Sequence, residues 1–278
     1  MAGFASYNDI INALTVNGQG QQIFWSKPGI TTVAAGIYDY AMQTTGIPGP
    51  GYVVGTALTG RAILDSTAGM PTFANPTGPA REHLLLVGAG STVSLGVLML
   101  YDRLIEYPFN GTVTSGTFTQ PGTFPPRDEA GTVNGSGVLM FVENANATAS
   151  TTPTLNITYT NQAGTGSRTT GAITLVGAAQ HRFAQNQLWF PLAAGDSGVR
   201  SVQSYTLSAT ATSTLMNIVL CRPLAFIPVP SGNTWVERDL VLQIASMPRL
   251  FDDTALCMAL IANTTTSPMQ ARVLSAEN

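Results

Sequence analysis

Short runs of alternating apolar and polar residues, separated by turn residues, make up most of this chain. The clearest run is 155–160, Leu-Asn-Ile-Thr-Tyr-Thr, whose period of two predicts a strand with one buried face. Residues 168–176 can pair back against it, with Ile173 and Leu175 on the buried side. Strand after strand with hardly any helix predicts an all-β fold, a β-sandwich or jelly roll.

Further strands are expected wherever an apolar run lies between turn residues. They are expected at 23–25, 37–42, 56–64, 82–87, 93–105, 109–120, 138–142, 205–209 and 215–221. Gly88-Ala89-Gly90 is expected to turn between two buried strands, and Pro223, Pro228 and Pro230 are expected to close the unit. Residues 93–105 are also compatible with a helix, because a short apolar run does not decide between the two.

One short helix is expected near the N-terminus. Ser6 is placed to cap it, and Asp9 stands where a capping-box acid reaches back to the cap. We therefore divide the chain into an N-terminal arm with this helix, residues 1–30, and a β-sandwich core, residues 31–278. A boundary between two sub-lobes of the core is expected near residue 130.

The chain carries few charges for its length. Its 278 residues include 12 basic and 15 acidic ones, or 10 %, whereas an ordinary soluble domain is about one quarter charged. A surface with so few ionic groups is tolerable when copies of the chain or other partners cover much of it. Lys27 is the single lysine and the arginines are scattered, so the cationic stripe that binds nucleic-acid phosphates is missing.

No secretory or membrane segment is expected. The N-terminus has neither a basic region nor an apolar run, as a signal peptide would. The longest uncharged apolar stretch, residues 84–101, is interrupted by glycines and falls short of a spanning helix.

Cys221 and Cys257 sit in apolar runs and are expected to be buried free thiols. A disulfide between them would need close Cα atoms, which the sequence cannot show.

Two short motifs imitate catalytic or cofactor-binding loops. Gly195-Asp196-Ser197-Gly198 resembles the nucleophile loop of chymotrypsin-like proteases, with His181 upstream as a possible base. Val199 stands where that family has a further glycine, and His181 lies too near in sequence, so a turn is the better interpretation. Gly88-Ala89-Gly90 imitates a dinucleotide-binding turn, but no amphipathic helix follows it.

Other candidates for chemistry are also interpreted as structural. His83 and His181 cannot build a histidine-rich metal site alone, and the paired acids Asp252-Asp253 and Asp128-Glu129 are expected to be solvated turn residues. The aromatic residues that could form a sugar platform are Tyr38, Tyr40, Trp25, Trp189 and Trp235. Such residues are more common in β cores and interfaces. We expect no catalytic residue, no metal and no cofactor.

Three segments carry a resemblance to a known class of proteins. They are 157–164, Ile-Thr-Tyr-Thr-Asn-Gln-Ala-Gly, then 168–170, Arg-Thr-Thr, and 190–202, Phe-Pro-Leu-Ala-Ala-Gly-Asp-Ser-Gly-Val-Arg-Ser-Val. These segments, and the opening residues 4–13, resemble virion structural proteins of tailed bacteriophages. The resemblance spans most of the chain and implies a β-rich protein of the particle, present in many copies and without enzymatic activity.

The resemblance and the low charge together suggest a capsid decoration or cement protein. We expect it on the capsid surface of the virion, assembled in the host cytoplasm, as a homotrimer that binds the major capsid protein through many modest contacts. The expected anchors of the N-terminal arm are Phe4, Tyr7, Ile10, Ile11 and Trp25. The alternative for this arm is a helix folded back on its own core. No small-molecule substrate, nucleic acid or membrane is expected as a partner.

Other functions remain open from the sequence. The chain could be a tail-associated protein or a host-recognition module that binds surface glycans through its loops and aromatic residues. It could also be the major capsid protein, although the scarcity of helix argues against the usual shell fold. An enzyme is considered only for Ser197 with His181.

Overall fold

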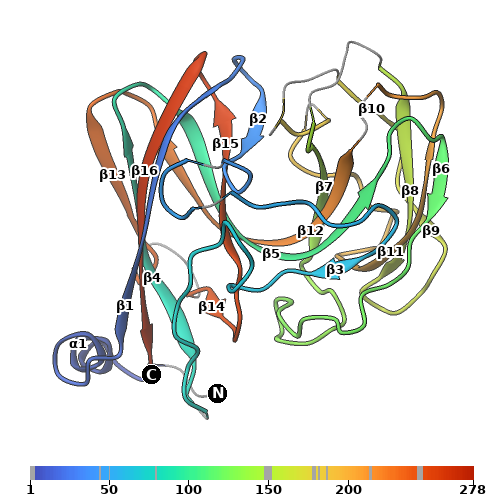
Figure 1. Cartoon of the computed structure of the whole chain (residues 1–278). Coiled ribbons are helices and arrows are strands. Elements are labelled where there is room, and N and C mark those ends of the chain that lie inside the picture. Colours follow the sequence, from blue (N-terminus) through green and yellow to red (C-terminus); the bar gives the residue numbers. More distant parts are fainter. Residues whose placement is uncertain are drawn as a thin grey trace.

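The computed structural model places most of the described backbone in antiparallel strands. The described residues are 4–43, 45–49, 51–78, 80–146, 152–176, 180, 182–185, 187–212, 215–242 and 247–278. The expected all-β, sandwich-like fold with one short N-terminal helix is confirmed within these residues. Three sheets make up the body of the protein (Figure 1).

The first sheet lies on the left of Figure 1 and carries both ends of the chain near its lower edge. Its strands, in spatial order, are β1 (Gly20–Thr31), β16 (Thr266–Glu277), β4 (Glu82–Ser91) and β13 (Thr234–Asp239), and the short β14 (Arg249–Leu250) pairs with β4. Burial alternates along β1 and β16, so one face of the sheet points into a core and the other to solvent.

The second sheet lies on the opposite side of the molecule (Figure 1). Its strands are β10 (Ile173–Thr174), β8 (Thr154–Asn161), β11 (Val199–Leu207) and β6 (Ser115–Thr117), and β9 (Arg168–Thr169) also pairs with β8. The predicted alternation of β8 and the return of the chain onto it are confirmed, with Leu175 buried and Ile173 partly buried.

The central sheet connects the other two. Its order is β2 (Ile37–Asp39), β15 (Leu256–Ala262), β5 (Gly96–Phe109), β12 (Met216–Val229) and β7 (Leu139–Asn144), with β3 (Arg61–Ala62) paired to β5. Figure 1 shows the long strands β5 and β12 sweeping from one side of the molecule to the other. Register shifts between them at Leu220/Cys221 and Pro223/Ala225 accompany this bend.

Each outer sheet packs on a different part of the same central sheet. The first sheet buries residues such as Val87 and Val273 against Leu98 of β5 and Met258 of β15. The second sheet buries its own set against the other halves of β5 and β12; among the residues of this second core are Ile157, Val202, Phe109 and Ile218. The molecule is therefore a pair of sandwiches that share two strands.

A short segment closes the central sheet into a barrel. The backbone N–H of Phe183 donates to Ile37 O at 2.8 Å, and that of Ala184 donates to Val142 O at 2.7 Å. Residues 182–184 thus hydrogen-bond to β2 on one side and to β7 on the other, where bridges join Tyr38 with Arg182 and Glu143 with Phe183. A third core cluster, which includes Met99, Phe141, Val219 and Cys257, fills the inside of this barrel.

Helix α1 (Tyr7–Thr15) packs across the end of the first sheet. The Ser6 hydroxyl accepts from the Asp9 backbone N–H while the Asp9 carboxylate accepts from the Ser6 N–H, so the predicted capping box is present. Ile10 and Ala13 are buried against Leu85 and neighbouring residues of the first sheet. The helix is therefore folded back on the protein's own core.

One predicted turn is wrong. Gly88-Ala89-Gly90 does not separate two strands, because β4 continues through these residues to Ser91. The physical reason is that these residues pair with β16 on one side and with β13 on the other. The glycines are needed because the indole of Trp235 lies on their outer side and occupies the space that side chains would need. The chain turns instead at 92–95, before β5 begins at Gly96.

Two of the three prolines expected to close the series also lie inside a strand, and the third, Pro230, directly follows the end of that strand. β12 runs through Pro223 and Pro228 to Val229. β7 pairs with β12 only as far as Cys221, so beyond that point β12 needs hydrogen-bond donors on the β5 side alone. A strand with one free edge tolerates proline, which lacks an N–H.

Two expected strands are much shorter than their apolar patterns suggested. The region 56–64 contains only β3, and 109–120 contains only β6 after the end of β5. The Asn110 side chain accepts hydrogen bonds from the N–H and hydroxyl of Thr112 and so favours a turn there. Residues 20–31 form β1 within the first sheet. The two sandwiches, which we call the two lobes, share β5 and β12.

Candidate functional site

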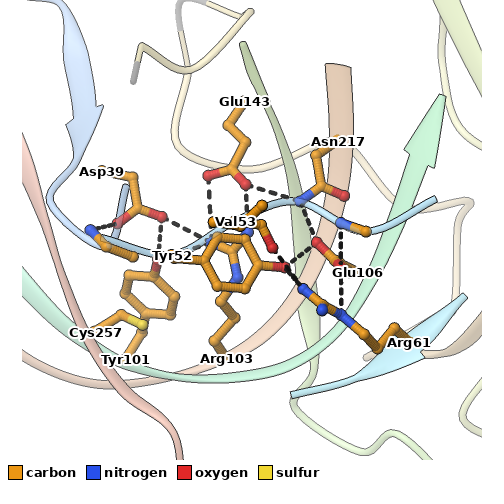
Figure 2. Close-up of polar contacts among 12 residues, drawn as sticks. Asp39, Tyr52, Val53, Arg61, Tyr101, Arg103, Glu106, Glu143, Asn217 and Cys257 are labelled. Carbon is orange, nitrogen blue, oxygen red and sulfur yellow. Dashed lines mark hydrogen bonds and ion pairs between the residues drawn. The ribbon is translucent and has the colours of Figure 1, made fainter. Parts of the chain in front are cut away.

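A cluster of fully buried charges lies inside the central barrel. Arg103 of β5 donates through Nη1 to Asp39 Oδ2 of β2 at 2.8 Å and through both terminal nitrogens to Glu143 of β7. The Tyr101 hydroxyl donates to Asp39 at 2.5 Å. Figure 2 shows that these side chains come from different strands and converge on one another.

A third carboxylate extends the cluster toward the surface. Glu106 accepts from Gly55 N at 2.9 Å, from Asn217 Nδ2 at 3.0 Å and from the Tyr52 hydroxyl, and it pairs with Arg61 Nε at 2.7 Å (Figure 2). The same Asn217 amide donates to Glu143 at 2.8 Å, which joins both parts into one network. Each carboxylate of the network therefore accepts several hydrogen bonds.

The protonation of this network follows from its burial. Burial raises the pKa of Glu106 to about 8 and that of Glu143 to about 7, while Arg103 opposes the rise at Glu143 and the Gly55 N–H opposes it at Glu106. Three carboxylates face two guanidiniums, so the network has one acid in excess. A carboxylate without its own cation in a low-dielectric interior holds a proton more tightly.

The network can fix strands but offers no open site for a substrate. Asp39, Arg103, Glu106 and Glu143 are all fully buried, and the Tyr52 ring covers Arg103 with its centroid 4.3 Å from the guanidinium carbon. Only Arg61 reaches solvent. Because the hydrogen-bonded side chains of the network come from β2, β5, β7 and β12, the network ties the barrel together across its interior.

A separate cluster of three charged residues sits on the other face of β5. Asp102 lies 3.4 Å from Arg127 Nη1 and 3.7 Å from Arg222 Nη2, and it accepts from the Ala255 N–H at 3.0 Å. Arg127 also donates to backbone carbonyls, including that of Ile63. This arrangement anchors loops between the lobes and is likewise buried.

The five expected interface residues are placed in different environments. Tyr7 and Ile11 are 57 % and 44 % exposed on the outer face of α1. Phe4 packs on His83 and the α1 cluster, and Ile10 is buried against the first sheet. Trp25 is only 4 % exposed and belongs to the first sandwich core. The structure therefore leaves two of the five available to a partner.

The protease-like loop has a structural explanation. Asp196 accepts from the Tyr159 hydroxyl, Asn161 Nδ2 and Arg168 Nε at 2.7, 2.7 and 2.9 Å, and these donors lower its pKa to about 2. The Ser197 N–H donates to Gln162 in the same turn. His181, the expected base, lies outside the described residues.

The paired acids do not gather into an ion site. Asp128 is buried and is not the solvated turn residue that was expected, because it accepts from backbone N–H groups of its own loop, including Thr132 at 2.7 Å and Gly135 at 3.0 Å. It therefore organises that loop. Asp253 accepts from Asn75 at 3.0 Å. Among the described residues no group of three or more His, Cys, Asp or Glu side chains is arranged to hold a metal ion.

Of the aromatic residues considered for sugar binding, one is well exposed. Tyr38, Tyr40 and Trp25 are buried, and Trp189 packs near Phe141. Trp235 of β13 is 45 % exposed beside a surface hollow of about 640 Å³.

The described part of the chain has no helix with the length and apolar character to cross a membrane.

Comparison with known proteins adds no identification. No family model, no curated protein and no solved structure matches the chain. The site is therefore interpreted from its own residues. Sequence reasoning missed the barrel network, although Arg103 and Glu106 stand in an apolar stretch of a chain with few charges, and that was the available signal.

Proposed function

We propose that this chain is a structural protein of a virus particle, a capsid decoration protein that acts by binding. The observation that carries the proposal is the uncovered outer face of α1. Tyr7 and Ile11, one helical turn apart, point away from the body of the protein, while Ile10 and Ala13 secure the helix from beneath. Exposed aromatic and aliphatic side chains on a firmly anchored element are typical of interface anchors.

The rest of the molecule agrees with a binding role. The ion pairs of Arg103 with Asp39 and Glu143 are fully buried inside the barrel, where they hold strands together. The surface carries few charges that would have to be desolvated in a contact. We propose that copies associate as a trimer and that many modest contacts with the major capsid protein add up around the shell.

The test removes the proposed anchor while leaving the fold intact. In a Tyr7→Ser/Ile11→Ser variant, we expect binding to capsids of the virus that encodes the chain to weaken about tenfold or more, because two apolar side chains lose their burial. Co-sedimentation with purified capsids, with copies counted per particle, measures this. Val33→Ser/Val113→Ser, which alters two exposed valines elsewhere, is the matched control and should bind normally.

Normal capsid occupancy by the Tyr7→Ser/Ile11→Ser variant would rule out α1 as the anchor. Wild-type protein located at a single vertex by labelled electron microscopy would instead favour a protein of the tail.

A further inference from the structure

Trp235 forms a flat aromatic surface on the outer face of the first sheet. It pairs directly with Gly90 of β4, and its indole extends over Gly88 as well. A Cβ atom at Gly88 would lie 2.9 Å from the indole Cζ2, and one at Gly90 would lie 2.8 Å from Cε3. The two glycines therefore let one face of the indole lie against the sheet, while the opposite face of the ring is exposed to solvent.

Polar side chains continue this surface across the sheet. Directly paired residues of neighbouring strands point to the same face. Gly90 pairs with Gln270 of β16, and Gln270 pairs with Ser26 of β1, so Trp235, Gln270 and Ser26 share one row. Neighbouring strands are about 4.8 Å apart, so the row is roughly 14 Å long.

The hollow beside this row is large enough for a ligand. Its volume of about 640 Å³ lies within the range of about 300–1,000 Å³ common for small-molecule sites. Its lining combines polar residues and glycines with the apolar side chains of Trp235, Pro28, Pro268 and Met269, and Thr92, Thr234 and Gln270 are among its hydrogen-bonding side chains. Hydroxyl and amide groups both donate and accept, which suits a ligand rich in hydroxyls.

The charged side chains around the hollow already have hydrogen-bond or ion-pair partners within the protein. The Trp235 Nε1–H donates to Glu237 at 2.8 Å, and Glu237 pairs with Arg272 at 2.5 Å. The Lys27 ammonium is buried and donates to the carbonyls of Gln43 and Pro48. An ionic ligand would therefore have to compete with these existing partners.

We propose that this hollow binds a neutral oligosaccharide. The C–H face of a pyranose ring stacks on the exposed indole, whose face is electron-rich. The hydroxyls of the following sugar units hydrogen-bond to Gln270, Ser26 and Thr234. The site lies about 20 Å along β1 from Gly20, near α1, so a copy held through α1 keeps the hollow exposed.

Neutral oligomers of hexoses and N-acetylhexosamines, presented as an array and then titrated in solution, are the probes. Binding is followed by NMR of the ligand and by the change in tryptophan fluorescence, in which the exposed Trp235 is the residue expected to respond. Gln270→Ala removes a hydrogen-bonding group and leaves the indole in place. We expect it to weaken binding about threefold to tenfold, and Trp235→Ala to abolish binding.

Gln22→Ala is the matched control, because Gln22 is exposed on β1 nearer to α1. It should leave the affinity unchanged. The proposal is overturned if no neutral oligosaccharide binds at millimolar concentration, if Gln270→Ala binds as tightly as wild type, or if sialylated oligosaccharides bind more tightly. Capsid binding by Gln270→Ala, which should be normal, keeps this test separate from the role of α1.

Discussion

At the scale of single residues, the unusual feature is Arg103. A fully buried guanidinium is costly to desolvate, and it is stable here because it faces Asp39 and Glu143 at once. The sequence shows this arginine in an apolar stretch but cannot show its partners, because Asp39 and Glu143 lie far away along the chain. Long-range pairing therefore limits what the sequence can predict about the site.

Removal of Arg103 should be strongly destabilising. In Arg103→Met the side chain keeps much of its volume, but two buried carboxylates lose their cation, which typically costs about 3–5 kcal/mol of unfolding free energy. Urea denaturation followed by circular dichroism measures the change. The control is Arg272→Met on the surface, where loss of the pair with Glu237 should cost less than about 1 kcal/mol. Equal losses in both variants would contradict a stabilising role for the network.

Glu82 gives a pH dependence of known sign. It is buried at the start of β4, and burial raises its pKa from 4.5 to about 7, with Glu277 adding to the rise and Ser275 and Gln21 opposing it. Between these two pH values the folded state binds more protons than the unfolded state. The unfolding free energy therefore falls as pH rises through this window, by about 3 kcal/mol in total.

Glu82→Gln should remove this contribution, because glutamine resembles the protonated acid at every pH. The variant should be more stable than wild type at pH 8, and the difference should shrink toward pH 5. Denaturation curves at several pH values measure the difference, which isolates Glu82 from other buried acids. A difference that stays constant with pH would show that Glu82 does not titrate in this window.

At the scale of elements, local patterns predicted what local interactions determine. The capping box of α1 and the alternation of β8 could both be predicted from the sequence, because each depends on residues a few positions apart. The continuation of β4 through two glycines could not be predicted from the sequence, because it depends on pairing with β13 and β16, which are distant in sequence. The passage of β12 through two prolines likewise depends on where β7 ends.

The edge of the first sheet shows a related effect. β1 is an edge strand, and its pairing with β16 shifts register between Lys27 and Ile30, around Pro28 and Gly29. Such irregularities discourage a neighbouring chain from adding to the edge. Contacts with partners are therefore more easily made by the side chains of α1 than by strand addition.

At the scale of the whole molecule, the barrel was beyond the reach of sequence analysis. The all-β class followed from composition and periodicity, whereas closure depends on residues 182–184 lying between β2 and β7. Because β5 and β12 belong to both sandwiches, neither lobe has a complete core without the other. We expect the two lobes to unfold together.

The two cysteines of the chain lie within this barrel, on the strands that flank β5. Cys221 and Cys257 are both free, and the strand between them keeps them roughly 10 Å apart, too far for a disulfide. The rate at which these thiols react therefore reports how fast the barrel opens. An alkylating reagent followed by mass spectrometry should modify both together, no faster than the protein unfolds. Rapid modification of one thiol alone would reveal that a lobe can open by itself.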